Sequence, residues 1–272
     1  MKTKKRYVKY VVIGIIATII ATYLSSGHKK KGHPRDYKEI RKEGILRVVT
    51  EYNSLNYYVD KDTVSGFHYD LICAFAKSRH LKVKITPEMS FEKQMEGLSS
   101  GKYDLIACGI SVTSELKDSI LLTKPIILNK QVLVQRKEKE HSNIYIRSQL
   151  DLANKKLHVV KGSPAILRIR NLSNEIGDTV YVEEIEKYGS EQLLAMVAHG
   201  DINYAVCDES TAHELINSFP QLDTKTAISF TQFYSWGVSK KSPVLLQTLN
   251  LWLTSFLKSD EYKRIYKKYY KD

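Results

Sequence analysis

Two similar segments, 99 residues apart, constrain the fold of this chain more than any other feature of its sequence. Residues 100–109 read SGKYDLIACG and residues 199–208 read HGDINYAVCD. Each segment has a glycine, a few polar residues with a tyrosine, a short apolar run and a cysteine, and each follows an amphipathic stretch. A short apolar run bounded by turn residues is typical of a buried strand. The spacing is too long for a solenoid repeat and favours two lobes of similar α/β build.

The residues that follow these two runs predict a ligand site. Gly109 and Ser111 end the first run, Thr113 has the chemistry of an N-cap for the helix expected after it, and Asp208 ends the second run. Ligands of open α/β sheets bind beyond the carboxyl ends of strands, where helix N-termini present free N–H donors. If the two lobes face each other, both strand ends line one cleft, and such clefts bind small molecules. The alternatives are an ordinary strand–turn–helix for the first segment and helix capping for Asp208.

A second helix N-terminus is predicted after a strand at 157–160. The sequence continues as KGSP, in which Ser163 can cap a helix and Pro164 suits its first turn because its missing N–H costs nothing there. Gly162 and Ser163 are therefore expected at the cleft. Further strands that cross between the lobes predict a two-stranded hinge. The expected organisation is lobe 1 at 44–131 and 237–272, lobe 2 at 135–231, and hinge segments at 131–136 and 232–238.

The amino-terminal region predicts export. Residues 11–24 form a nearly continuous apolar run of 14 residues, shorter than the roughly 17–25 residues of a spanning helix and within the roughly 7–15 of a signal-peptide core. Residues 1–27 are expected to be a signal peptide or, preferably, an uncleaved signal anchor with a hydrophobic helix, and 28–43 a basic linker. The protein is then expected on the periplasmic side, anchored to the inner membrane by 11–24.

Charge and motif content exclude several function classes. The formal net charge is +12, but the first 35 residues hold nine Lys and Arg and no acidic residue, so the remainder carries only +3. No basic stripe indicates a nucleic-acid partner. Cys73, Cys108 and Cys207 lie in apolar contexts that favour buried thiols over metal or redox sites. No nucleophile elbow, HExxH or paired-carboxylate signature is present, so we expect no catalytic residues, no metal, no cofactor and no enzyme activity.

Motifs distributed over residues 44–270 resemble the family 3 solute-binding proteins, the extracytoplasmic receptors for polar amino acids. They lie at 46–48, 66–71, 101–106, 109–113, 131–134, 161–163, 206–209 and 262–269. A closer resemblance, at 53–55, 188–191 and 202–204, is to the non-catalytic amino-terminal module of membrane-bound lytic transglycosylase F. The resemblance implies a type II periplasmic-binding-protein-like fold, with a mixed sheet flanked by helices in each lobe. The catalytic domain of that enzyme follows the module, and because this sequence stops at Asp272 we expect no lytic activity.

The resemblance also implies roles for individual residues. Gly109 and Ser111 would offer a carbonyl and a hydroxyl to the ligand, Gly162 and Ser163 would donate N–H groups to a carboxylate, and Asp208 would pair with an α-ammonium. The implied site is completed by Asn53, by Thr113, and by Tyr57 or Tyr58 as an aromatic wall.

One departure from the family pattern changes the expected ligand. Amino-acid receptors have an arginine three residues after the Thr113 position, as a bidentate clamp on the α-carboxylate, and here that residue is Leu116. Lys117 lies about 100° further around the helix, and an ammonium does not replace a planar fork. Pro164 also removes one N–H from the second anion site. We therefore expect a peptide, a muropeptide fragment or a related ligand with a masked carboxylate, rather than a free α-amino acid.

Two functions follow from these observations. The first is a monomeric binding protein that closes two lobes around a small ligand, for a membrane transporter or for cell-wall sensing. The alternative is a protein related to lytic transglycosylases that regulates or contributes to peptidoglycan turnover with a wall-degrading partner.

Overall fold

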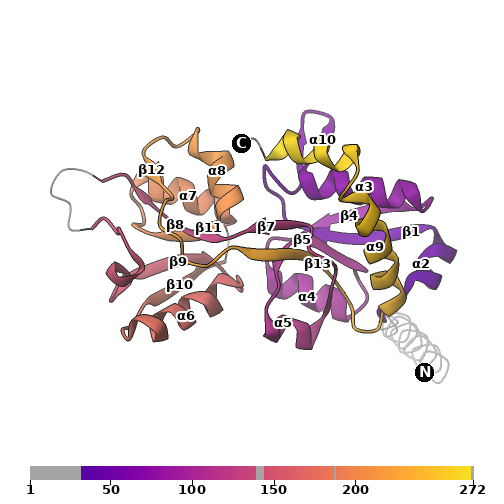
Figure 1. The fold of residues 1–272 in the computed structure, drawn as a ribbon, viewed down its shortest axis with the longest axis horizontal. Helices are drawn as coiled ribbons and strands as arrows, with labels where there is room; N and C mark the ends of the chain where they lie inside the picture. The colour runs from indigo at the N-terminus through magenta and orange to yellow at the C-terminus, as the bar shows by residue number, and fades with distance from the viewer. Residues whose placement is uncertain (1–31, 139–143, 187, 271–272) are drawn as a thin grey trace, which may run out of the picture. The chain divides into compact units, whose positions relative to one another are not determined.

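Two mixed β-sheets organise residues 34–272 (Figure 1). The computed structural model describes residues 32–138, 144–186 and 188–270. The first sheet has the strand order β4-β1-β5-β13-β6, with β7 paired to β13. Its strands are β1 Ile45–Thr50, β4 Lys82–Pro87, β5 Leu105–Ser111, β6 Leu121–Leu122, β7 Ile127–Asn129 and β13 Gln232–Val238. Strands β1, β4 and β5 are parallel, and β13 runs antiparallel to β5, β6 and β7.

Helices cover both faces of the first sheet because the side chains of its central strand alternate between two cores. In β5, Leu105 and Ala107 belong to one buried cluster, whereas Ile106, Cys108 and Ile110 belong to another. The helices are α2 Tyr37–Glu43, α3 Phe67–Ser78, α4 Phe91–Ser99, α5 Ser114–Ser119, α9 Pro243–Phe256 and α10 Asp260–Tyr269. A small ribbon, β2 Tyr58–Asp60 with β3 Thr63–Ser65, precedes α3.

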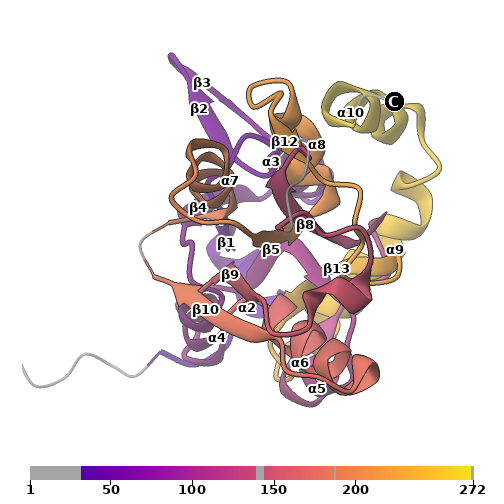
Figure 2. The same ribbon diagram turned by 90° about the vertical axis from the view of Figure 1, so that its left-hand side faces the viewer.

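The second sheet repeats this construction with the order β10-β9-β11-β8-β12. Its strands are β8 Gln131–Arg136, β9 Lys156–Val160, β10 Tyr181–Ile185, β11 Ala205–Asp208 and β12 Leu222–Asp223. Its helices are the 3₁₀ turn η1 Gln149–Leu152, α6 Ala165–Ile176, α7 Ser190–His199 and α8 Glu209–Ile216. Figure 2 shows α7 and α8 on one side of this sheet and α6 on the other. Leu133 packs with α6, and its neighbours Val132 and Val134 pack with α7.

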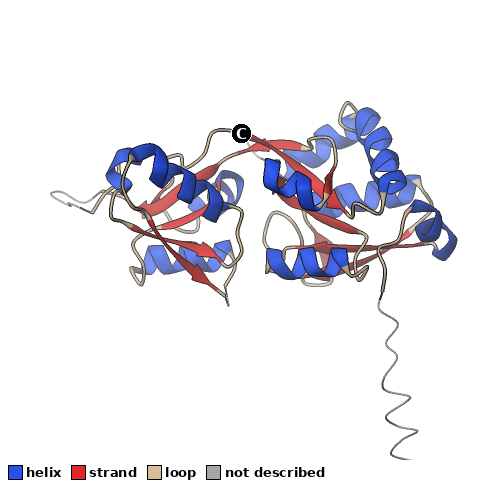
Figure 3. Ribbon diagram, turned by 90° about the horizontal axis from the view of Figure 1, so that it is seen from below, coloured by secondary structure: helices blue, strands red, loops and turns tan. Residues whose placement is uncertain are grey.

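The prediction of two similar α/β lobes is confirmed. The two repeated segments form equivalent units, α4 followed by β5 and α7 followed by β11, and the tyrosine of each unit is buried. We call residues of the first sheet and its helices lobe 1, and those of the second sheet and its helices lobe 2. Two chain segments connect the lobes, one from β7 to β8 and one from β12 to β13 (Figure 3).

The connections are shorter than the hinge segments expected from the sequence. Strand β8, expected to cross between the lobes, pairs along its length within the second sheet, and β13 pairs only with strands of the first. The chain therefore changes sheet at Lys130 and at residues 224–231. At the first connection Asn129 Nδ2 donates to Ser210 Oγ at 2.8 Å, and the Glu209 N–H donates to the Lys130 carbonyl at 2.8 Å.

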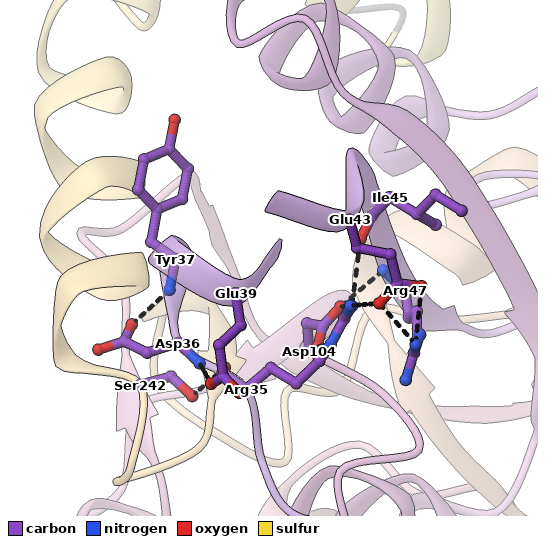
Figure 4. A network of polar contacts seen from close by, with 9 residues as sticks. All are labelled: Arg35, Asp36, Tyr37, Glu39, Glu43, Ile45, Arg47, Asp104 and Ser242. Atoms are coloured by element: carbon purple, nitrogen blue, oxygen red, sulfur yellow. Dashed lines mark hydrogen bonds and ion pairs between the residues drawn. The ribbon is translucent and has the colours of Figure 1, made fainter. Parts of the chain in front are cut away.

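The linker expected at 28–43 ends earlier than predicted. Residues Tyr37–Glu43 form helix α2, because Asp36 caps its N-terminus and Ile40 is fully buried against lobe 1. Arg35 just before it forms a buried ion pair with Asp104 and donates to the Ile45 carbonyl at 3.1 Å, and its own carbonyl accepts from Ser242 Oγ at 2.8 Å (Figure 4). This network makes residues from 35 onward part of the fold.

The expected signal anchor at 1–27, including the apolar run 11–24, lies outside the described residues. Within the residues that are described, no helix combines the length and the apolar character needed to cross a membrane.

Candidate functional site

A chamber of about 70 Å³ lies between the lobes, at the carboxyl ends of parallel strands from both sheets. Lobe 1 contributes Glu51, which follows β1, and residues 109–111 at the end of β5. Lobe 2 contributes Asp208 at the end of β11 and the turn that follows β9. Strand ends carry the ligands of open α/β sheets because the loops after them expose unpaired polar groups. The chamber is therefore the candidate site.

The structure brings five of the nine predicted site residues to this chamber. They are Asn53, Gly109, Ser111, Ser163 and Asp208. The other four, Tyr57, Tyr58, Thr113 and Gly162, do not line it.

Neither tyrosine expected to form the aromatic wall lines the chamber, because both have other packing partners. The Tyr57 ring lies edge-on to the rings of Tyr52 and Tyr69, with centroids 6.1 and 5.9 Å away. Tyr58 begins the β2–β3 ribbon and packs against the core of lobe 1. Thr113 has the capping role that its position predicts, since its Oγ1 accepts from the Leu116 N–H at 3.4 Å.

Glu51 is the main residue that the sequence analysis missed. Its carboxylate lines the chamber, and its Oε2 accepts from Asn53 Nδ2 and Asn56 Nδ2, each at 3.3 Å. The pKa of Glu51 is raised from 4.5 to about 7, chiefly by burial and also by the negative charge of Asp208, against the opposing effect of the Asn56 bond. The sequence did contain a signal for Glu51, because it is an acidic residue immediately after the first parallel strand.

Asp208 faces the chamber from lobe 2. It stands at the N-cap position of α8, but its side chain makes no capping bond, so the alternative role of helix capping is not supported. Instead Oδ1 accepts from Tyr234 Oη at 2.7 Å. Burial raises the pKa of Asp208 from 3.8 to about 6, and the bond from Tyr234 acts in the opposite direction. The chamber therefore holds two carboxyl groups, one from each lobe, in a poorly solvated place.

Gly109 is needed for the position of that tyrosine. A Cβ added at Gly109 would lie 2.6 Å from Tyr234 Cδ1, well inside van der Waals contact. The glycine thus lets the Tyr234 ring cross β5 and reach Asp208. Where β5 ends and β13 begins, the Ser111 hydroxyl donates to Gln232 Oε1.

Gln131 carries an unpaired acceptor beside the chamber. It begins β8, lines the chamber and is 6% exposed. Its Oε1 is buried and makes no hydrogen bond within the described residues. An unpaired buried carbonyl costs free energy, and this cost is removed when a ligand donates to it.

Two of the three cysteines, Cys108 and Cys207, also line the chamber. Both are free and buried, and burial raises the pKa of each thiol. Across residues 32–138, 144–186 and 188–270, no group of three or more His, Cys, Asp or Glu side chains is placed to hold a metal ion.

Comparisons with known proteins found a matching family and several relatives. The family model for bacterial extracellular solute-binding proteins, family 3, matches residues 46–272. Membrane-bound lytic murein transglycosylase F from Photobacterium profundum is 25% identical over 265 residues, which cover 96% of this chain and 50% of that protein. The same enzyme from Aliivibrio fischeri is 27% identical over 238 residues, 86% of this chain and 47% of that protein. The chain thus spans about half the length of these relatives.

Solved structures with the same fold include several receptors for amino acids. An ancestral arginine-binding protein bound to arginine has a TM-score of 0.73 and 26% identity, covering 84% of this chain and 98% of its own. An ancestral arginine-binding protein bound to glutamine has the same score and identity, covering 84% and 99%. A mutant of ArgBP from T. maritima has a TM-score of 0.75 and 24% identity, covering 86% and 99%.

Proposed function

This chain belongs to the bacterial extracellular solute-binding proteins of family 3, and we propose that it binds a small ligand through a cationic group held between Glu51 and Asp208. This proposal rests on one observation: a carboxyl group from each lobe lines the same chamber. Within the described residues, neither carboxylate forms an ion pair with a lysine or an arginine. A bound cation would supply the missing charge and would return the pKa of both groups toward their ordinary values.

The proposed ligand class is amino-acid-like and includes amine-bearing peptides and muropeptides. The ancestral arginine-binding protein, bound to arginine or to glutamine, supports a small nitrogen-rich ligand in this fold. We propose that the lobes, 44–131 with 237–272 and 135–231, close on the ligand by bending at their two connections. Both walls of the chamber belong to one chain, so the proposed binding needs no second copy, and we propose a monomeric binding protein.

We also propose an extracytoplasmic location, with the amino-terminal segment as a membrane anchor. This family operates outside the cytoplasm, and a membrane transporter is the partner that a receptor of this kind would serve.

Titration calorimetry on the full chain tests the proposed function. Arginine, lysine, agmatine and cadaverine are the cationic probes, and glutamine and glutamate are the neutral and acidic ones. We expect at least one cationic probe to bind and Glu51→Gln or Asp208→Asn to weaken it tenfold or more, because each variant removes one charge from the pair. The matched control is Glu214→Gln, an exposed position on α8. Equal binding of a cation by all variants would refute the proposal.

A second candidate function rests on the curated relatives. Because membrane-bound lytic murein transglycosylase F matches 96% of this chain, a role in regulating or contributing to peptidoglycan turnover is the alternative. Incubation of the full chain with purified peptidoglycan tests it, alone and with a wall-degrading enzyme. Release of muropeptides by the chain alone, or a changed rate for the enzyme, would support this alternative over a transport receptor.

A further inference from the structure

We infer that the ligand is an organic cation without a free carboxylate, an alkyl amine or a guanidine rather than an α-amino acid. This inference rests on the proposed function and narrows its ligand class. It follows from the charges and donors of the chamber: its two carboxyl groups have no lysine or arginine partner among the described residues, and the N–H groups expected to bind a carboxylate are bonded within the protein.

The lobe 2 N–H donors that the sequence predicted for a ligand carboxylate are used within the protein. The Gly162 N–H, expected to bind a ligand carboxylate, donates to Glu184 Oε2 at 2.8 Å. The Ser163 N–H donates to the Val160 carbonyl at 3.0 Å, and Pro164 has none. At the start of α6 the Ala165 N–H donates to Ser163 Oγ at 3.2 Å. Glu184 thus accepts from the N–H that was expected to bind a ligand carboxylate.

Lobe 1 provides no clamp in its place. Leu116, at the position where an arginine was expected, packs against the apolar cluster of lobe 1 that includes Ile106 and Ile120. Lys117 is exposed and does not line the chamber. Among the described lining residues, Lys161 is the one cationic side chain; it pairs with Glu186, and its side chain is 44% exposed. No arginine fork therefore meets a ligand carboxylate.

The two carboxyl groups of the chamber accept hydrogen bonds and have no lysine or arginine partner among the described residues. Glu51 and Asp208 carry negative charge when ionised, and Gln131 Oε1 is buried without a partner. A ligand carboxylate placed here would face two like charges, with no arginine among the described lining residues to balance its own charge. A protonated amine or a guanidinium instead offers three to five N–H donors and no acceptor. The chamber therefore selects for the cation and against the carboxylate.

Matched pairs of ligands that differ in one carboxylate test this inference on the unmodified full chain. Agmatine is compared with arginine, and cadaverine with lysine, by titration calorimetry at pH 8 and constant ionic strength. We expect the amine of at least one pair to bind tenfold or more tighter than its amino acid. Glu51→Gln is measured with the better ligand, as a separate readout of the cation site.

The outcomes separate the two proposals. If an amino acid binds as tightly as its decarboxylated partner and Glu51→Gln weakens both, the cation site stands and the inference on the carboxylate is wrong. If no probe binds at millimolar concentration, or Glu51→Gln has no effect, the proposed function and the inference both fail.

Two variants test the structural reason for the preference. Leu116→Arg introduces the missing fork, and we expect it to improve arginine binding more than agmatine binding, so that the ratio of their affinities falls at least tenfold. Gln131→Met removes the unpaired acceptor at similar size, and we expect it to weaken agmatine several-fold. Glu214→Gln is the control. If Leu116→Arg leaves the ratio of agmatine to arginine affinity unchanged, the missing arginine is not the reason for the preference.

Discussion

The backbone N–H of Ser54 donates to Glu191 Oε1 at 2.6 Å, which joins the loop after β1 in lobe 1 to the first turn of α7 in lobe 2. A carboxylate in the first turn of a helix is itself favourable, since it meets the positive end of the helix dipole. Beside it, a Cβ at Gly189 would lie 2.5 Å from Met89 Cε, so the lobes approach closely at this edge. Glu191 therefore joins the two lobes at this edge of the chamber.

Removing this hydrogen bond should weaken the binding of every ligand around which the two lobes close. A hydrogen bond to a charged group contributes about 1.5–3 kcal/mol, so we expect Glu191→Ala to raise the Kd about tenfold or more. Small-angle scattering should show a larger radius for the liganded variant. Glu214→Ala is the matched control on lobe 2. A Glu191→Ala protein with unchanged affinity would show that the contact does not contribute to closure.

Ligand affinity should depend on pH through the two carboxyl groups of the chamber. The pKa of Glu51 is about 7 and that of Asp208 about 6, both raised chiefly by burial. A cation binds the ionised forms, so affinity should increase from pH 5 to pH 8, with release of protons near pH 6 to 7. Calorimetry in two buffers of different ionisation enthalpy measures that release. Constant affinity over this range would contradict the assignment.

The ligand-free protein should lose stability over the same pH range. Because folding raises the pKa of Glu51 from 4.5 to about 7, its contribution to the free energy of unfolding is fully present below pH 4.5 and is lost as pH rises through 7. Glu51→Gln keeps an acceptor for the two asparagines and removes the charge. At pH 8 we expect the free energy of unfolding of the variant, measured in urea, to be about 1–3 kcal/mol higher than that of the native protein. At pH 4 we expect little difference. The opposite sign at pH 8 would refute the raised pKa.

Tyr234→Phe should move the pH dependence of binding in a defined direction. The bond from Tyr234 Oη lowers the pKa of Asp208 against the effect of burial. Its loss should raise that pKa, so the lower limb of the affinity–pH curve should shift to higher pH while the Gly109 contact with the ring is kept. Tyr262→Phe, which loses a bond to the Ile126 carbonyl away from the chamber, is the control and should leave the curve in place.

Arg35→Ala should destabilise lobe 1 strongly. Arg35 is 7% exposed and Asp104 2%, and Nε donates to Asp104 Oδ1 at 3.0 Å. Removing one partner of a buried ion pair leaves the other charge without compensation and costs about 3–5 kcal/mol. Urea unfolding measures the change. Arg47→Ala, which breaks a more exposed ion pair with Glu43, should cost less than about 1 kcal/mol, and similar losses for both variants would contradict the network.

The sequence by itself determined the two-lobe α/β fold and the strand ends that meet at the chamber. The runs that became β5 and β11 are short, apolar and bounded by turn residues, and such patterns depend on burial and on neighbours along the chain. The absence of an arginine at Leu116 was also readable, because it concerns one position of a local motif.

Only the tertiary structure decided how the site is completed. Glu51 and Asp208 line the same chamber, and Glu184 accepts from the Gly162 N–H, because residues distant in sequence meet where loops of different strands converge. The displacement of Tyr57 from the chamber depends likewise on its ring partners in space. These contacts depend on loop conformation and lobe packing, which leave no periodic signal in the sequence, and they decide which charges the ligand meets.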